Sequence, residues 1–339
     1  MSDKFRKFIG IDVSKAHIHV CLMDDERKVL AACNIKNEAD AVTKGISTLL
    51  EKHQITIEEV FCCIESTGKY DRRASNAIYE MGIALGVEPY WQIQSNLHVR
   101  NKNDQTDAER IADFARASYT TIRRWKPRSK SALALLELLS IREALSDERR
   151  GYIVRLAEIE ATVGYSPTGI KLIRRRIKGL KADLEELERE IAQLIKADKR
   201  FYRIYKLLLS IPGIGKVNAW MLLAVTDGFA RFATPRQLAA YSGVAPYEFR
   251  SGSSIRKRSK VSHRSNKQLK SLLHMAAVSI TTRGKETDLR RFYERKLKEG
   301  KHKMSALNMV RNKLIHLIFA VIKRGTPYQT IHPNNTTAA

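Results

Sequence analysis

A run of apolar residues near the N-terminus, Phe8–Lys15 (FIGIDVSK), predicts a strand buried in a sheet, because β-branched and aromatic residues dominate it. One carboxylate, Asp12, interrupts the run. Two interpretations of this charge stay open on the stretch alone. Asp12 either caps the turn that begins at Ser14, or it binds a metal ion from a rigid strand, with Gly10 beside it allowing close approach.

The pattern that follows alternates predicted strands and helices. Counting the first run, strands are predicted at 8–15, 17–23, 28–35, 60–65 and 86–91. Helices are predicted at 37–52, at 71–85, and from about residue 104 onward, where Ile111, Phe114 and Ala115 share a face. The first three strands form an antiparallel meander. The order β-β-β-α-β-α-β-α is typical of a ribonuclease-H-like α/β fold.

Four carboxylates fall at the ends of these strands or at the start of the last helix: Asp12, Glu65, Asp104 and Asp107. Asp104 and Asp107 are three residues apart and therefore share a helix face, although acids in a first turn are also favoured by the helix dipole. Two divalent ions beside a phosphate need several oxygen ligands from separate elements. We interpret the four residues as a site for divalent metal ions.

The charge balance indicates a polyanionic partner. Lysine and arginine outnumber aspartate and glutamate by 61 to 36, a formal charge of +25, and nucleic acid is the first candidate. Ribosomal and architectural proteins share this property, so charge alone does not establish catalysis. The N-terminus has no apolar signal core, and no uncharged apolar run approaches the roughly 20 residues of a membrane span. We expect a cytoplasmic protein without a membrane partner.

Cysteine and histidine usage gives no sign of another metal site. The cysteines lie in predicted strands without the paired spacing of zinc ligands, and we expect them to be reduced and buried: Cys21, Cys33, Cys62 and Cys63. His17 and His19 alternate with apolar residues, so they share one strand face. We expect that face to be solvated.

A long helical hairpin is predicted beyond Pro127. Apolar residues at helical spacing run from 141 to 163, and after a break at 164–169 a second set alternates steps of three and four, which is typical of a coiled-coil seam: Ile173, Ile177, Leu180, Leu184, Leu187, Ile191 and Leu194. The second helix would be about 40 Å long. The two stripes pack on each other or on another copy of the chain, and both arrangements stay open.

Two later segments carry features of phosphate binding. The run IPGIG at 211–215 resembles the helix-hairpin-helix motif of DNA-binding proteins, although an ordinary glycine turn would look the same. A loop rich in glycine, proline and serine at 243–254 runs into a basic stretch, and a serine in it could also act as a nucleophile. The residues expected to contact nucleic acid are Gly213, Gly215, Lys216, Arg250, Arg256, Lys257, Arg258, Lys260, His263 and Arg264.

Five motifs together resemble a known family. IGIDVSK, IESTG, NDQTDA, IPGIG and GVAPYEFRSG occur in the order and spacing of the DEDD transposases of bacterial insertion sequences, family 110, which are described as bridge-RNA-guided recombinases. The resemblance implies a RuvC-like domain at 1–126, a coiled-coil linker at 127–200, a mostly helical transposase domain at 201–325 and a tail at 326–339.

The resemblance also implies a chemistry. The acidic tetrad falls on Asp12, Glu65, Asp104 and Asp107, which in the family hold magnesium, and the catalytic serine falls on Ser251, with Ser253 and Ser254 as its neighbours. A structured guide RNA would pair with donor and target DNA, and the protein would form a dimer or tetramer. A RuvC-like endonuclease or resolvase that uses activated water is the alternative, and a nucleic-acid-binding scaffold with an inactive acidic site is the third hypothesis.

Overall fold

A computed structural model describes residues 5–94, 104–162, 166–247, 250–251, 255–256, 260–261, 265–282 and 286–329, with backbone alone at 104–105, at 246–247 and in the three residue pairs between 250 and 261. The chain divides into two compact units, Met1–Pro127 and Arg128–Ala339. The first predicted domain boundary lies beside this division. The further boundaries at 201 and 326 stay predictions.

The first unit contains a five-stranded sheet in the order β3-β2-β1-β4-β5. β1 to β3 form the predicted antiparallel meander, and β4 and β5 run parallel to β1. The strands are β1 (Lys7–Val13), β2 (His17–Asp24), β3 (Val29–Lys36), β4 (Val60–Glu65) and β5 (Ala84–Glu88). This topology confirms the predicted ribonuclease-H-like α/β fold of the N-terminal part of the chain.

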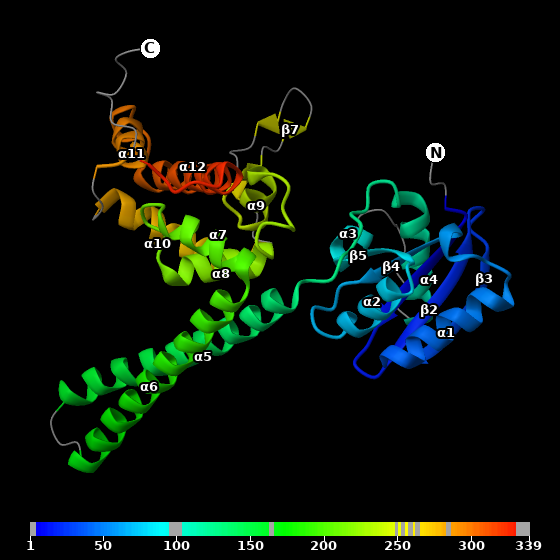
Figure 1. The fold of residues 1–339 in the computed structure, drawn as a ribbon, viewed down its shortest axis with the longest axis horizontal. Helices are drawn as coiled ribbons and strands as arrows, with labels where there is room; N and C mark the ends of the chain where they lie inside the picture. Colours follow the sequence, from blue (N-terminus) through cyan, green and yellow to red (C-terminus); the bar gives the residue numbers. More distant parts are fainter. Residues whose placement is uncertain are drawn as a thin grey trace. The chain divides into compact units, whose positions relative to one another are not determined.

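Helices cover both faces of this sheet (Figure 1). Because side chains alternate along a strand, Ile9 and Ile11 of β1 point to the face covered by α1 (Ala39–Lys52) and α2 (Asp71–Glu80). Phe8 points to the opposite face, where it packs in a cluster with Phe114 of α4 (Asp104–Ser118). Asp12 follows Phe8 and Gly10 at steps of two residues, so its side chain also points to the face covered by α4.

The chain between α2 and α4 differs from the prediction. α2 ends at Glu80, five residues before the predicted end, and Gly82 takes a left-handed conformation (φ 81°) that a helix cannot continue through. β5 is shorter than predicted because Pro89 lacks the amide that the ladder needs. The next residues form a short helix, α3 (Tyr90–Gln94), and a single 3₁₀ turn, Ile57–Glu59, precedes β4.

Helix α4 lies directly on β1 at Gly10. A side-chain carbon at this position would lie 2.2 Å from the Ala108 carbonyl oxygen and 2.2 Å from the Ala112 amide nitrogen. Gly10 permits the close approach of the α4 backbone, whereas its predicted role beside a bound metal ion stays a prediction. Gly10 therefore fixes the distance between β1 and the helix that carries Asp107.

The Gly10→Ala protein is expected to lose roughly 3 kcal/mol of unfolding free energy, because an added carbon must push helix backbone away from the sheet. Gly151→Ala is the matched control: nothing lies within 4 Å of its added carbon, and alanine in a helix is favoured over glycine by about 0.5–1 kcal/mol. Urea denaturation of the two variants measures both effects. Equal stability of Gly10→Ala and the wild type would contradict the close packing.

Two acidic residues of this unit, for which a solvated side chain would be the ordinary expectation, are buried. Asp113 of α4 is 7% exposed and pairs with Arg27 and Arg116 at 3.0 Å each. Asp71 at the start of α2 is 6% exposed, and burial raises the pKa of its carboxyl. Sequence periodicity could not identify either residue, because Arg27 comes from a distant turn and the burial of Asp71 depends on how α2 docks.

The cysteines behave largely as predicted. All four are free thiols, and three are buried: Cys21, Cys62 and Cys63. Cys33 of β3 is only half-buried, because β3 is the edge strand of the sheet. Burial raises the pKa of Cys21 to about 12. A thiol with so high a pKa stays protonated and unreactive at neutral pH.

The second unit begins with the predicted helical hairpin, α5 (Lys130–Glu160) and α6 (Pro167–Ala197), each 31 residues long. The helices run antiparallel, because three ion pairs join positions that ascend on α5 and descend on α6: Arg142–Glu188, Glu148–Arg176 and Glu160–Arg174. Leu180, Leu187 and Ile191 of the predicted seam are buried, and the other four members are half-buried. The supercoil of a true coiled coil stays a prediction.

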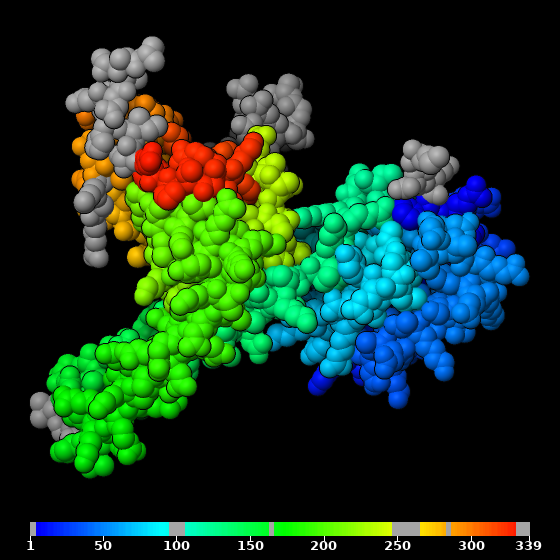
Figure 2. All heavy atoms as spheres, in the orientation of Figure 1, coloured from blue at the N-terminus to red at the C-terminus, as the bar shows by residue number. Residues whose placement is uncertain are grey.

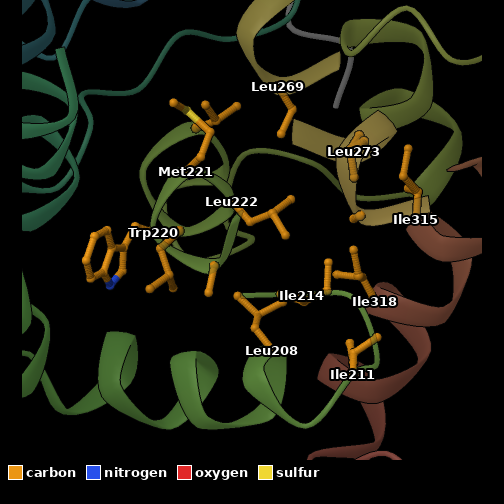
Figure 3. Close-up of a cluster of buried hydrophobic side chains, with 14 of the residues drawn as sticks. Leu208, Ile211, Ile214, Trp220, Met221, Leu222, Leu269, Leu273, Ile315 and Ile318 are labelled. Carbon is orange, nitrogen blue, oxygen red and sulfur yellow. The ribbon is translucent and has the colours of Figure 1, made fainter. Parts of the chain in front are cut away.

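The rest of this unit is a helical bundle around one apolar core. Its helices are α7 (Lys199–Leu209), α8 (Lys216–Thr226), α9 (Pro235–Tyr241), α10 (Lys267–Thr282), α11 (Asp288–Lys298) and α12 (Lys303–Arg324). Figure 3 shows side chains of this core, which come from α7, the α7–α8 turn, α8, α10 and α12. The hairpin α5–α6 extends away from this bundle (Figure 2).

Helix α12 is, within the described residues, the one helix long and apolar enough to cross a membrane by length and composition. It packs into the core of the bundle, where Leu314, Ile315 and Ile318 are fully buried. A buried core helix of a folded domain meets the same criterion, so α12 gives no indication of a membrane protein.

Candidate active site and nucleic-acid interface

Asp12 and Glu65 lie side by side at the carboxyl ends of two parallel strands. The last aligned pair of β1 and β4 is Ile11 with Ile64, and each carboxylate follows directly. Neighbouring strands are about 4.8 Å apart, and both side chains point to the α4 face. The topology thus brings together two acids that are 53 residues apart in the sequence.

Asp107 joins them from α4. The contact of Ala108 with Gly10 holds the helix over β1, and Asp107 precedes Ala108. Asp107 and Glu65 line one shallow pocket, together with Tyr90, Ile93, Gln94, Arg110 and Ile111. Three members of the predicted tetrad therefore meet at one edge of the sheet, while the side chain of Asp104 lies outside the described residues.

The described carboxylates do not form a complete metal-coordination site in this structure. Asp107 Oδ1 accepts a hydrogen bond from Arg110 Nη1 at 2.7 Å. Among the described side chains, no group of three histidine, cysteine, aspartate or glutamate residues forms a ready metal cluster. A bound cation would compete with Arg110 for Asp107.

Glu88 is a neighbouring acid that the sequence analysis did not single out. It is the last residue of β5 and the aligned partner of Glu65. It is 9% exposed, and burial raises the pKa of its carboxyl. The one sequence feature that could have identified Glu88 as a site residue is its position in the run GVEP, where a carboxylate ends a predicted strand before a proline.

His19 lies opposite Asp12 on β2. The predicted solvated histidine face is correct for His17, which is exposed, and wrong for His19, which is half-buried with its Nδ1 shielded and without a partner. α4 packs over this face of the sheet and covers His19. An uncompensated imidazole nitrogen beside a carboxylate is a polar environment suited to a bound ion or ordered water.

The donor set at this edge fits a hard divalent cation. Asp12, Glu65 and Asp107 supply the carboxylate oxygens that Mg²⁺ and Mn²⁺ prefer. Two buried polar groups lie beside them. Burial raises the pKa of the Glu88 carboxyl, and Nδ1 of His19 has no hydrogen-bond partner among the described residues. Both groups lie beside the carboxylates by strand register, so a cation bound at this edge would meet further polar groups there.

The segment predicted as a serine loop forms a short ribbon. β6 (Pro246–Tyr247) pairs with β9 (Lys260–Val261), and inside it β7 (Arg250–Ser251) pairs with β8 (Ile255–Arg256), both antiparallel. Ser251 is the last β7 residue before the turn. Its side chain and those of the neighbouring basic residues lie outside the described part of the chain, as do Ser253, Ser254, Lys257, Arg258, His263 and Arg264.

The IPGIG run connects α7 to α8 as a tight turn. Gly213 has φ 80°, and a side-chain carbon there would lie 2.5 Å from Ile280 of α10, so this glycine is needed for packing. Gly215 caps α8, and both it and Lys216 are exposed. The first amides of α8 are thus open to solvent beside a lysine, as phosphate binding needs, while a DNA-binding role for the turn stays a prediction.

Two family models match the chain. A DEDD transposase model of IS110 elements matches residues 9–159, and the model "Transposase IS116/IS110/IS902 family" matches residues 205–294. Together they include most of β1, all of α4, nearly all of the hairpin helix α5 and the segment that carries Ser251.

Curated relatives agree with these models. The chain is similar to the pilin gene-inverting proteins of Moraxella bovis (28% identity) and Moraxella lacunata (27% identity), each covering 95% of this chain and 98% of the relative. It is also similar to the transposase of insertion sequence element IS1111A from Coxiella burnetii, with 26% identity over 95% of this chain and 91% of the relative.

Among solved structures, Thermus thermophilus RuvC in complex with a Holliday junction substrate matches 35% of this chain and 99% of its own, with 12% identity and a TM-score of 0.28. The strand order described above, rather than this likeness, carries the fold assignment. With both family models and relatives that match along nearly the whole chain, the protein belongs to the IS110 family of DEDD transposases, enzymes that recombine DNA.

Proposed function

We propose that this transposase cuts and rejoins DNA through Ser251, with a divalent cation at Asp12, Glu65, Asp104 and Asp107. The observation that carries the proposal is the convergence of Asp12, Glu65 and Asp107 at one edge of the sheet. Ser251 supports it by position, since it ends a strand at the turn of a ribbon.

In the proposed reaction the Ser251 hydroxyl gives up its proton and forms an ester with the phosphorus, while the bridging oxygen of the DNA strand leaves as a hydroxyl. Rejoining reverses the step with the hydroxyl of another strand. Bound Mg²⁺ or Mn²⁺ would polarise the phosphate and offset its developing charge. Asp12, Glu65 and Asp107 are held on rigid strands and on a helix fixed at Gly10, so binding a cation would need side-chain movement, including release of Asp107 from Arg110, rather than movement of the backbone.

The alternative is a RuvC-like nuclease in which an activated water, rather than Ser251, attacks the phosphate. The two reactions differ in what can be trapped, because only a side-chain nucleophile leaves protein joined to DNA. The test is to incubate the wild-type protein, Mg²⁺ and a nicked duplex that stalls rejoining, then to denature the mixture and look for DNA that migrates with protein. Cleavage without any adduct would assign the activity to the nuclease.

A guide RNA and a homo-oligomer are part of the proposal. The family resemblance and the formal charge of +25 support the RNA, and copurification of RNA of one defined length is the expected result. Apolar side chains on the α5–α6 hairpin support association of copies as a dimer or tetramer, since Ile153, Val154 and Leu172 are 41%, 52% and 49% exposed.

The basic stretch after Ser251 is expected to bind backbone phosphates. If Arg256, Lys257, Arg258 and Lys260 each neutralise one phosphate, replacing all four by alanine should lower the log–log salt slope of duplex binding by about 0.9 per contact. The loss should be similar on all sequences. Filter binding of one duplex across a salt series measures the slope, and an unchanged slope would place the nucleic acid elsewhere.

A further inference from the structure

Arg311 of α12 is a buried cation for which the described residues provide no counter-ion. It is 8% exposed and is the one lysine or arginine among the described residues that is buried. Its Nε is shielded from solvent and has no hydrogen-bond partner. Burial lowers the pKa of the guanidinium, although arginine remains charged at any physiological pH. A charge in this position is costly unless something pairs with it.

Two buried acids that have partners, one in each unit, provide the comparison. Asp113 pairs with two arginines, and Asp227 accepts hydrogen bonds from the amide and hydroxyl of Ser129. Arg311 alone among the charged residues of the helical bundle is buried with no such partner in the described part of the chain. Within the described residues no carboxylate pairs with Arg311, which leaves room for an anion from outside the protein.

Two neighbours of Arg311 also have unsatisfied polar atoms. His274 of α10 has a shielded Nδ1 without a partner, and its pKa is lowered by burial and then by the nearby charge of Arg311. Asn308, one helical turn before Arg311, has a shielded Oδ1 without a partner. A neutral imidazole still offers one N–H donor. Arg311 and His274 together can thus present several donors to one anion, and arginine's planar fork matches a phosphate.

The location connects this pair to the serine ribbon. Nδ2 of Asn308 donates to the carbonyl oxygen of Val244 at 3.0 Å, and Val244 lies two residues before β6, the outer strand of the ribbon that carries Ser251. Arg311 is buried but keeps 8% of its surface exposed. An anion bound there would lie at the base of the ribbon.

We propose that Arg311 and His274 form a binding site for a backbone phosphate of the DNA strand on which the Ser251 ribbon acts. The choice of this strand as ligand rests on the proposed function of Ser251, whereas the existence of an anion site does not. Asn308 is a positioning residue that joins the site to the start of the ribbon.

The free and bound proteins should respond in opposite directions to the loss of Arg311. Arg311→Met keeps a similar length and removes the charge. It is expected to raise the melting temperature of the nucleic-acid-free protein by about 3 °C, because an unpaired buried charge is gone. It should weaken duplex DNA binding about tenfold to hundredfold and lower the salt slope by about 0.9. A structural arginine would give a lower melting temperature and unchanged binding.

Two further variants complete the experiment. Lys323→Met removes one charge from an exposed position of the same helix and should leave the melting temperature of the free protein unchanged. Arg311→Lys retains the charge without the fork, and should keep the salt slope while losing part of the affinity. If Arg311→Met does not fold, the Arg311→Lys protein decides, since wild-type affinity for DNA in that variant would contradict fork-like phosphate recognition.

The ligand is identified by comparing probes on the full chain. The melting temperature is measured in sodium phosphate and in sodium chloride of equal ionic strength. That of the wild type should be higher in phosphate, and this difference should vanish in Arg311→Met. DNA and RNA duplexes of matched length separate the two sources of phosphodiester. A defect confined to RNA would overturn the assignment to DNA. None of these measurements needs strand cleavage. Failure of the anion site and failure of the proposed Ser251 chemistry can therefore be distinguished.

Discussion

The Ser251→Ala protein is expected to bind DNA and RNA like the wild type, and to form neither a covalent adduct nor a recombinant product. The substitution removes one oxygen from a ribbon whose backbone pairing, Ser251 with Ile255, does not involve the side chain. Without the hydroxyl no ester to phosphorus can form, so both strand cleavage and rejoining stop. The expected loss is at least about 1000-fold, as for removal of other nucleophiles.

Neighbouring serines supply the controls for this experiment. Ser253→Ala and Ser254→Ala alter hydroxyls within three residues of Ser251 and should still form the adduct. Ser251→Cys should retain some cleavage, because a thiolate is a nucleophile at neutral pH. Mass spectrometry of the trapped adduct locates the linked residue. A link to Ser253 or Ser254 would keep the chemistry and change the residue, while wild-type cleavage by Ser251→Ala would assign the reaction to activated water.

Much of the first unit could be predicted because its information is local. β4 was predicted with its observed bounds, since the run at 60–65 is uniformly apolar and ends in a charge. Ile111, Phe114 and Ala115 are all buried as their helical spacing predicts. The order of the elements predicted the ribonuclease-H-like fold, while the strand order and the adjacency of Asp12 and Glu65 came from the structure.

Features that depend on distant partners could not be predicted. Asp113 is buried because Arg27 of the β2–β3 turn pairs with it, and no spacing rule links those two positions. Glu88 becomes the neighbour of Glu65 only through the β4–β5 register. Arg311 occupies a position in α12 that looks like a break in an apolar stripe. Its meaning depends on His274 and Asn308, which pack beside it only in the folded bundle.

Alanine at Asp12, Glu65, Asp104 or Asp107 is expected to lower strand transfer by at least about 1000-fold while leaving the protein folded. Removing one ligand removes charge stabilisation of several kcal/mol in the transition state. Stability should not suffer, because like charges at one edge of a sheet repel each other when no cation is bound. The melting temperature without metal should therefore be unchanged or higher than that of the wild type.

The control for the helix positions is Glu109→Ala, which removes the same charge from an exposed residue of α4 two positions beyond Asp107. It should retain strand transfer and the stabilisation by Mg²⁺ that calorimetry or thermal melting detects in the wild type. Asp107→Ala should lose both, although it also breaks the 2.7 Å contact with Arg110, a partly exposed pair worth at most about 1 kcal/mol. Loss of metal-dependent stabilisation separates a ligand from a residue that only supports the fold.

If Asp104→Ala and Asp107→Ala both recombine DNA at the wild-type rate, the acidic residues of α4 are not metal ligands. Asp12 and Glu65 would then need another acidic partner, and Glu88, the aligned neighbour of Glu65, is the first candidate.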